Sequence, residues 1–161
     1  MAKISKVLEI DNCNKEDLLK VIYNAKFWEE ITPTTEVNAE FIAPNVLYSR
    51  IKDQISLINV PIEMEGELVL TDLGEQEGKG KLIELNVRNN KNVRKLEGRL
   101  RVKALSQNKT KIGVFIDTLI LDSEFLNLFG GAADLTLQRK ITEILRNLEK
   151  ICKNNKLREF L

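Results

Sequence analysis

Apolar and polar residues alternate along most of the chain between Thr35 and Ile120, as they do in β-strands that have one face against a core and the other in water. The clearest run covers residues 58–70, where the apolar side chains fall on one side and Asn59 and the glutamates fall on the other. Runs of the same kind precede and follow it, and together they predict seven strands. The other six runs cover residues 3–10, 35–41, 46–53, 81–88, 96–104 and 112–120.

Two short helices are predicted between the first and the second strand. Asn14 is a good N-cap, and Glu16 and Asp17 follow it in the first turn, where the helix dipole favours negative charge. Asn24 is the expected N-cap of the second helix. Pro33 closes that helix, because the residue before a proline avoids the helical region.

A long amphipathic helix is predicted at the C-terminal end of the chain. Ser123 is the expected N-cap, and apolar residues then recur in steps of three and four as far as Cys152. Gly130 and Gly131 interrupt this pattern near its start. The two glycines fit either a hinge or portal, or a junction from which the helix restarts near Asp134, and the sequence leaves both interpretations open.

This order of elements leaves a wide apolar sheet face for a single helix to cover. Seven strands at a spacing of about 4.8 Å span roughly 34 Å, whereas one helix is only about 10–12 Å across. The clean alternation indicates an antiparallel sheet with one wet face. We therefore expect the sheet to curl around the terminal helix, to take the short helices along its open side, and to leave an apolar cavity between sheet and helix.

The composition fits one domain that covers residues 1–161. The 25 basic and 24 acidic residues give a net charge of +1, which offers no basic excess for nucleic-acid binding. The chain lacks a signal-like apolar segment and any run of about 18 apolar residues, so we expect no membrane span and a cytoplasmic location. Cys13 and Cys152 lie far apart and there is no histidine, so we expect two reduced thiols, no metal and no cofactor. A monomer or a weak homodimer is expected.

The order strand, helix pair, six strands, long helix resembles the START and birch-pollen-allergen superfamily, also called SRPBCC. Residues 27–33, Phe-Trp-Glu-Glu-Ile-Thr-Pro, look like the segment before the second strand in polyketide cyclase-like members. Residues 129–131, Phe-Gly-Gly, look like the glycine-rich helix start of the carbon monoxide dehydrogenase subunit-like members. The resemblance implies an α+β helix-grip fold, with a seven-stranded curved antiparallel sheet, two short helices after the first strand, and a long C-terminal helix. It also implies a cavity for a lipid, isoprenoid or polyketide.

The residues expected to line the cavity share the inward phase of their strands or helices. Plain core packing is the alternative explanation for each of them, and anchoring of its helix is the alternative for Trp28. The candidates are Trp28, Phe41, Tyr48, Met64, Leu68, Leu85, Leu100, Val114, Ile116, Phe129, Gly130, Leu137 and Ile141.

Tyr48 and Arg50 are the best polar candidates, and the strand register decides which way they face. If the preceding loop is only Pro44-Asn45, Tyr48 aligns with Phe41 and points inward. If the loop includes Ala43, Tyr48 and Arg50 face water. Proline fits poorly in the favoured two-residue hairpin loops, which favours the second arrangement.

Two further features have open interpretations. Gly66 and Gly98 lie within strands, where they fit either bulges that bend the sheet or places of close approach. A basic row on the wet face fits a solvated surface paired with Glu63, Glu65 and Glu67, or a surface for a phosphate-bearing partner. The row consists of Lys95, Arg99, Arg101 and Lys103.

These observations favour a module that binds a small hydrophobic molecule, such as a lipid, isoprenoid or polyketide-like compound. The first alternative is a polyketide cyclase or dehydratase-like enzyme in which Tyr48, Arg50 or an acidic residue polarises a carbonyl group of the substrate. The second is a protein-interaction module. No residue is assigned a catalytic role, because without histidine the Ser–His and Cys–His pairs are impossible, and whether the chain is an enzyme stays open.

Overall fold

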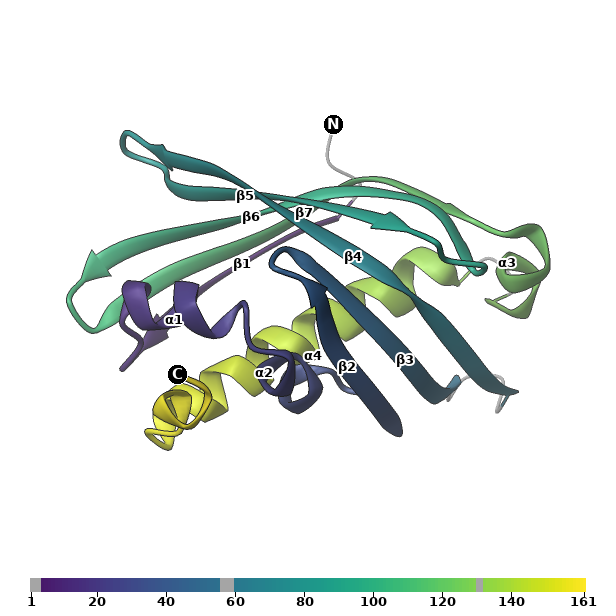
Figure 1. The fold of residues 1–161 in the computed structure, drawn as a ribbon, viewed down its shortest axis with the longest axis horizontal. Helices are drawn as coiled ribbons and strands as arrows, with labels where there is room; N and C mark the ends of the chain where they lie inside the picture. Colours follow the sequence, from purple (N-terminus) through teal and green to yellow (C-terminus); the bar gives the residue numbers. More distant parts are fainter. Residues whose placement is uncertain (1–3, 56–59, 130–131) are drawn as a thin grey trace.

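The computed structural model describes residues 4–55, 60–129 and 132–161. Seven antiparallel strands form one sheet, as the alternation predicted, and their order in the sheet is β1-β7-β6-β5-β4-β3-β2 (Figure 1). Every neighbouring pair except β1 and β7 follows in sequence, so the sheet is a meander whose first strand returns to its last. The strands are β1 (Ile4–Asp11), β2 (Glu36–Ala43), β3 (Val46–Ile55), β4 (Val60–Gln76), β5 (Gly80–Arg88), β6 (Val93–Ser106) and β7 (Lys109–Leu121).

The helices also follow the predicted order. Asn14 caps the first short helix by accepting the Asp17 N–H, and Asn24 caps the second by accepting the Lys26 N–H. The C-terminal helical region is divided in two, and a short 3₁₀ helix that the sequence did not predict follows it. The helices are α1 (Lys15–Val21), α2 (Ala25–Ile31), α3 (Ser123–Phe129), α4 (Ala133–Lys153) and η1 (Leu157–Phe160).

Two predicted boundaries were wrong. Ser123 is the first residue of α3 rather than its cap, and the Asp122 carboxylate accepts the Glu124 N–H instead. The connection between the predicted strands at residues 58–70 and 81–88 is shorter than their spacing suggests, because β4 continues to Gln76 through an irregularity between Asp72 and Gly74. Gly74 has a φ of +87°, a conformation that glycine adopts without strain and that lets the strand continue past the irregularity.

The sheet curves around α4, and α2 closes one side of the resulting grip (Figure 1). Helix α4 packs on the edge strand β1, while α2 contacts both α4 and the opposite edge strand β2. Lys140 and Asn147 of α4 donate hydrogen bonds to the carbonyl oxygens of Pro33 and Ile31, at 2.6 and 3.0 Å. Glu29 of α2 accepts the Ala39 N–H of β2 at 2.8 Å. The helix is therefore fastened to both edges of the sheet.

Apolar side chains between sheet and helix form two separate clusters. The larger one joins the concave sheet face to α1, α2 and the C-terminal two thirds of α4, and contains Phe27, Leu70, Ile83 and Leu148 among its most buried members. The smaller one is built on Phe125 and Phe129 of α3. The apolar core is therefore continuous around the C-terminal part of α4, while α3 forms a separate cluster at the other end of the grip.

Cys13 and Cys152 lie in the larger cluster, and both thiols are free and fully buried. A hydrogen bond with Cys13, together with burial, raises the pKa of the Cys152 thiol. A protonated, solvent-excluded thiol is a poor nucleophile, so this cysteine acts as a core residue.

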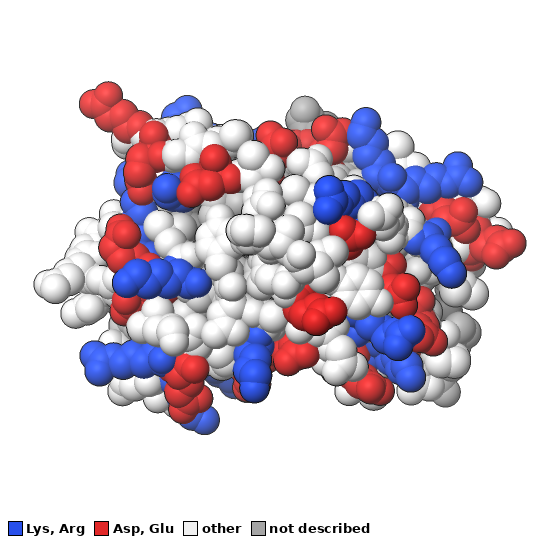
Figure 2. Space-filling view, in the orientation of Figure 1, with Lys and Arg blue, Asp and Glu red and all other residues white. Residues whose placement is uncertain are grey.

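None of the helices within the described ranges is both long and apolar enough to cross a bilayer. On the face shown in Figure 2, basic and acidic side chains are interspersed around a central area without charges.

Truncating a side chain of α4 that faces the sheet should lower the free energy of unfolding far more than truncating one that faces water. Leu148 is 2% exposed and Leu135, on the same helix, is 47% exposed. We expect Leu148→Ala to lower the free energy of unfolding by about 2–5 kcal/mol and Leu135→Ala to change it by less than about 0.5 kcal/mol. Urea denaturation followed by circular dichroism measures both. Equal losses would show that α4 does not bury this face against the sheet.

Candidate ligand-binding site

Five of the predicted cavity residues are buried in the larger apolar cluster. Leu85, Leu100, Val114, Ile116 and Ile141 are each 9% exposed or less, and all lie in the larger cluster. Their burial follows from strand alternation and from the packing of α4 side chains against the concave face in the same cluster. Close packing accounts for these five side chains as they stand.

Trp28 acts as an anchor for its helix. Its indole N–H donates to the Ile22 carbonyl oxygen at 2.6 Å, and its ring meets Phe27 edge-on with 6.4 Å between centroids. The ring is partly buried against the larger cluster. These contacts fix α2 to the end of α1, which is the anchoring role that the sequence left open.

The remaining apolar candidates are partly covered or belong to the smaller cluster. Phe41, Leu68 and Leu137 are partly buried at the border of the larger cluster. Met64 packs against Phe125 and Phe129 in the smaller one. Gly130 lies outside the described residues.

Tyr48 and Arg50 lie on the outer face of the sheet, which corrects the inclusion of Tyr48 among the cavity residues. Leu47 of the same strand is 3% exposed and faces inward. Arg50 pairs with Glu65 at 3.1 Å, and Tyr48 stands directly opposite Glu67. The enzyme alternative therefore loses both of its polar candidates.

The β2–β3 hairpin explains why the loop length alone did not decide this orientation. The loop is only Pro44-Asn45, since Ala43 pairs with Val46, but the register shifts between Phe41 and Ala43. This irregularity brings Phe41 opposite Leu47, so that both point inward. A short loop with one extra strand residue thus gives the orientation that the longer loop predicted.

A row of partly buried apolar side chains crosses the concave face near α3. Val37 of β2 pairs with Ile51 of β3, and Ile51 pairs with Met64 of β4. All three have inward phase and keep part of their surface in water. Val37 lies in the predicted strand at residues 35–41 but was not among the cavity candidates, because no sequence pattern showed how much of the sheet α4 would cover.

Gly66 and Gly98 have different structural roles. The pairing of β6 with β7 shifts register between Glu97 and Gly98, as expected for a bulge. Gly66 pairs regularly with Ser49, and a Cβ atom there would lie 2.4 Å from Nδ2 of Asn90. Gly66 therefore makes room for the side chain of Asn90, a residue that sequence analysis missed.

Asn90 places an amide group on the concave face between the two apolar clusters. Its Oδ1 accepts the N–H groups of Asn92 and Val93 at 2.9 and 3.0 Å, which stabilises the β5–β6 turn. Met64 on one side of Gly66 belongs to the smaller cluster and Leu68 on the other side to the larger one. The amide is thus a polar group at an otherwise apolar boundary.

An ion pair joins the sheet to the helix at the same end. Lys140 Nζ lies 2.8 Å from Oδ2 of Asp53, whose side chain is only 11% exposed. Burial by itself raises the pKa of Asp53, but the hydrogen bond from Lys140, the Gln54 N–H and the positive charge of Lys140 outweigh it, so the pKa of Asp53 lies below its usual value. The Asp53 side chain is therefore a carboxylate at neutral pH.

Two shallow hollows of about 250 Å³ each are found on the described surface. One lies on the outer face of β1, β6 and β7, beside the β4–β5 turn, and the other between β1 and the outward side of α4. Neither lies between the concave sheet face and α4. An enclosed cavity in the grip stays a prediction.

The Asp53–Lys140 pair should make stability depend on pH in acid. Because the folded pKa is lowered, the pair stabilises fully above the unfolded value of 3.8, and this contribution is lost as pH falls through the folded value. We expect Asp53→Asn to cost about 1–3 kcal/mol at pH 7 and progressively less below pH 3.8. Asp11→Asn is the control, since that carboxylate is 88% exposed. Unfolding curves at several pH values measure both; a cost independent of pH would contradict the assigned pair.

Sequence comparisons find no family model and no curated protein that matches the chain. Solved structures, in contrast, resemble it over nearly its whole length. A START superfamily protein from Mycobacterium smegmatis aligns with a TM-score of 0.60 at 12% identity, over 94% of this chain and 97% of that one. The Zhui aromatase/cyclase from Streptomyces sp. R1128 aligns at 0.57 and 10%, over 92% and 94%.

A STAR-related lipid transfer protein fragment from Xanthomonas axonopodis aligns with a TM-score of 0.61 at 9% identity, over 92% of this chain and 84% of that one. At such low identities the likeness concerns the fold and not the activity. Together with the seven-stranded antiparallel sheet closed around α4, these alignments show that the chain has the START-like helix-grip fold.

Proposed function

We propose that the protein binds a small hydrophobic molecule, a lipid, isoprenoid or polyketide-like compound, between the concave sheet face and the N-terminal part of α4. The observation that carries this proposal is the partly exposed inward row of Val37, Ile51 and Met64. Inward apolar side chains in the middle of the sheet, such as Leu70 and Ile83, are almost completely buried. A guest at this end would cover the surface that the helix leaves open.

The separation of the two apolar clusters supports this location. A single continuous core would leave the guest nothing to cover, whereas here the larger cluster ends near Leu68 and the smaller one begins at Met64. The smaller cluster is formed by few residues, so it costs less to rearrange than the main core does. We infer that a ligand enters by moving α3 rather than α4.

Two polar features near this row are suited to orient a guest. The amide nitrogen of Asn90 would donate to a carbonyl or hydroxyl oxygen of the ligand, since Oδ1 is already engaged in the turn. The Asp53–Lys140 pair bounds the site on the side of α4. One hydrogen bond and one charged boundary would select an apolar molecule with a single polar end.

The expected affinity is modest. Burying about 400 Å² of apolar ligand surface contributes roughly 10 kcal/mol at about 25 cal/mol per Å². Immobilisation costs about 4 kcal/mol or more, which leaves at most about 6 kcal/mol and a Kd of tens of micromolar at best.

The folds compared above support the ligand class without fixing it. Among them are a lipid transfer protein and an aromatase/cyclase. An enzymatic role has no comparable support here, since Tyr48 and Arg50 point away from the grip. We therefore assign binding and no reaction.

The test places a polar group in the proposed site. Nile red, a neutral apolar dye, serves as the probe, and Ile51→Gln is compared with Ile42→Gln, which changes an isoleucine that is 52% exposed. We expect Ile51→Gln to weaken dye binding by roughly tenfold, because the amide loses water without gaining a partner, and Ile42→Gln to leave it unchanged. Fluorescence titration measures the Kd, and circular dichroism confirms the fold.

Native mass spectrometry of the purified wild-type protein, followed by organic extraction, identifies any carried molecule. Equal dye affinity in wild type and Ile51→Gln would contradict the proposed site, whatever the dye binds.

A further inference from the structure

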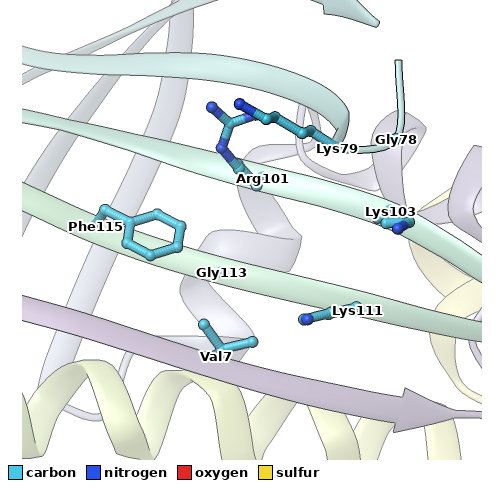
Figure 3. Close-up of a pocket in the computed structure, with 8 residues that line it drawn as sticks. All are labelled: Val7, Gly78, Lys79, Arg101, Lys103, Lys111, Gly113 and Phe115. Atoms are coloured by element: carbon cyan, nitrogen blue, oxygen red, sulfur yellow. The ribbon is translucent and has the colours of Figure 1, made fainter. Parts of the chain in front are cut away.

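The outer face of the sheet carries a basic hollow that the proposed binding function does not use. It has a volume of about 250 Å³ and combines cationic with apolar lining (Figure 3). Its cations come from β6, β7 and the β4–β5 turn, and its apolar part comes from β1 and β7. The residues are Val7, Gly78, Lys79, Arg101, Lys103, Lys111, Gly113 and Phe115.

Strand register builds the hollow from three neighbouring strands. Arg101 pairs with Gly113, and Gly113 pairs with Val7. Two residues further along the same strands, Lys103 pairs with Lys111. Because the side chains of alternate residues share a face, all of these positions point away from α4.

Glycine at position 113 makes room for the Phe115 ring on the floor of the hollow. A Cβ atom on Gly113 would lie 2.7 Å from Cε2 of Phe115 and 3.6 Å from Cγ2 of Val7. The edge of the aromatic ring therefore lies over the bare backbone of Gly113. The guanidinium of Arg99 stands 5.2 Å from the centroid of the Phe115 ring and also pairs with Asp117 at 2.8 Å, which holds the ring in place.

The β4–β5 turn brings a further cation to the edge of the hollow. Gly80 has a φ of +83°, and a Cβ atom there would lie 2.3 Å from the carbonyl oxygen of Val102, so this turn approaches β6 as only glycine allows. Gln76 accepts a hydrogen bond from Arg101 at 2.8 Å. Lys79 is thereby held beside Arg101 (Figure 3).

The charges of the hollow are not neutralised by the described part of the chain. Several other cations on this face have acidic partners: Lys95 pairs with Glu97, and Lys109 with Glu9. This corrects the expected pairing of the basic row with Glu63, Glu65 and Glu67, since β5 separates β4 from β6. For Lys79, Lys103 and Lys111 the described residues provide no carboxylate within ion-pair distance.

Lys103 and Lys111 stand directly opposite each other, and like charges in such a pair destabilise a sheet. Glu9, which is opposite Lys111 on its other side, contacts Lys109 instead at 3.6 Å. The fold thus retains an unfavourable arrangement of cations around an apolar floor. A bound anion would remove this repulsion, whereas dissolved ions at physiological salt screen it only in part.

We propose that this hollow binds a phosphate group with two or more negative charges, carried by a molecule whose carbon portion contacts Phe115 and Val7. Three flexible lysine side chains and the guanidinium of Arg101, which Gln76 holds in place, surround one space and match the several acceptor oxygens of a phosphate. The apolar floor, formed by Phe115 and Val7, gives the attached carbon atoms an apolar surface to pack on. The site lies on the opposite face of the sheet from the proposed ligand site and is independent of it.

The test compares two lysines of β6 on the same face. Lys103→Gln removes a charge from the hollow, whereas Lys95→Gln removes the same charge from a lysine that already has a partner. With inorganic pyrophosphate as the soluble probe, we expect Lys103→Gln to weaken binding about fivefold and Lys95→Gln by less than about twofold. NMR titration of backbone amides measures the Kd and should show shifts at Gly113 and Phe115.

Thermal unfolding gives a readout that a structural role would not produce. Without ligand, Lys103→Gln should raise Tm by about 1 °C, because it removes the repulsion from Lys111. With pyrophosphate present, Tm should rise less in this variant than in wild type. A lower Tm in the variant, together with unchanged pyrophosphate binding, would overturn the proposal.

A second arm identifies the source of the phosphate. Vesicles of phosphatidylcholine with phosphatidic acid are sedimented with wild type, Lys103→Gln and Lys95→Gln. A lipid headgroup is supported if the protein binds the vesicles but not pyrophosphate, and if only Lys103→Gln weakens the vesicle binding. A soluble phosphate is supported if the protein binds pyrophosphate and only Lys103→Gln weakens that binding. Binding of neither probe, or binding that both variants weaken equally, rejects the site.

Discussion

The packing of α4 against the concave face of the sheet is the constraint on which the rest of this structure depends. One helix cannot cover a flat seven-stranded sheet, so the sheet curves until the edge strand β1 packs on α4 and the opposite edge strand β2 packs on α2 beside it. Side chains of α4 then fasten it by hydrogen bonds to the link between α2 and β2, through Lys140 and Asn147. The position of every inward residue relative to solvent follows from where this helix lies.

The cover that α4 provides is uneven, and this unevenness separates packing from potential binding. Around Leu148 the helix, the sheet and the short helices exclude water almost completely. Near α3 the same concave face keeps partly exposed apolar residues, an amide at Asn90 and the Asp53–Lys140 pair. Such a mixture of apolar surface and a few fixed polar groups is typical of small-molecule sites.

The two faces of the sheet have different chemistry because strand alternation separates them. Inward positions are apolar and outward positions carry most of the charge, so the net charge of +1 hides local differences. Ion pairs such as Arg50–Glu65 and Arg99–Asp117 neutralise much of the outer face. The hollow over Gly113 departs from this pattern, since its lysines face one another across neighbouring strands.

Local sequence patterns determined the elements, their order and the inward phase of most strands, because alternation, helix caps and helical periodicity are properties of neighbouring residues. Asn14, Asn24 and the described part of the run at residues 58–70 were therefore interpreted correctly. The tertiary structure alone decided the orientation of Tyr48, through an irregularity beside Phe41, and the role of Gly66, through the distant Asn90. It also decided how far α4 covers the sheet and which lysines meet across strands, because these depend on contacts between residues far apart in the chain.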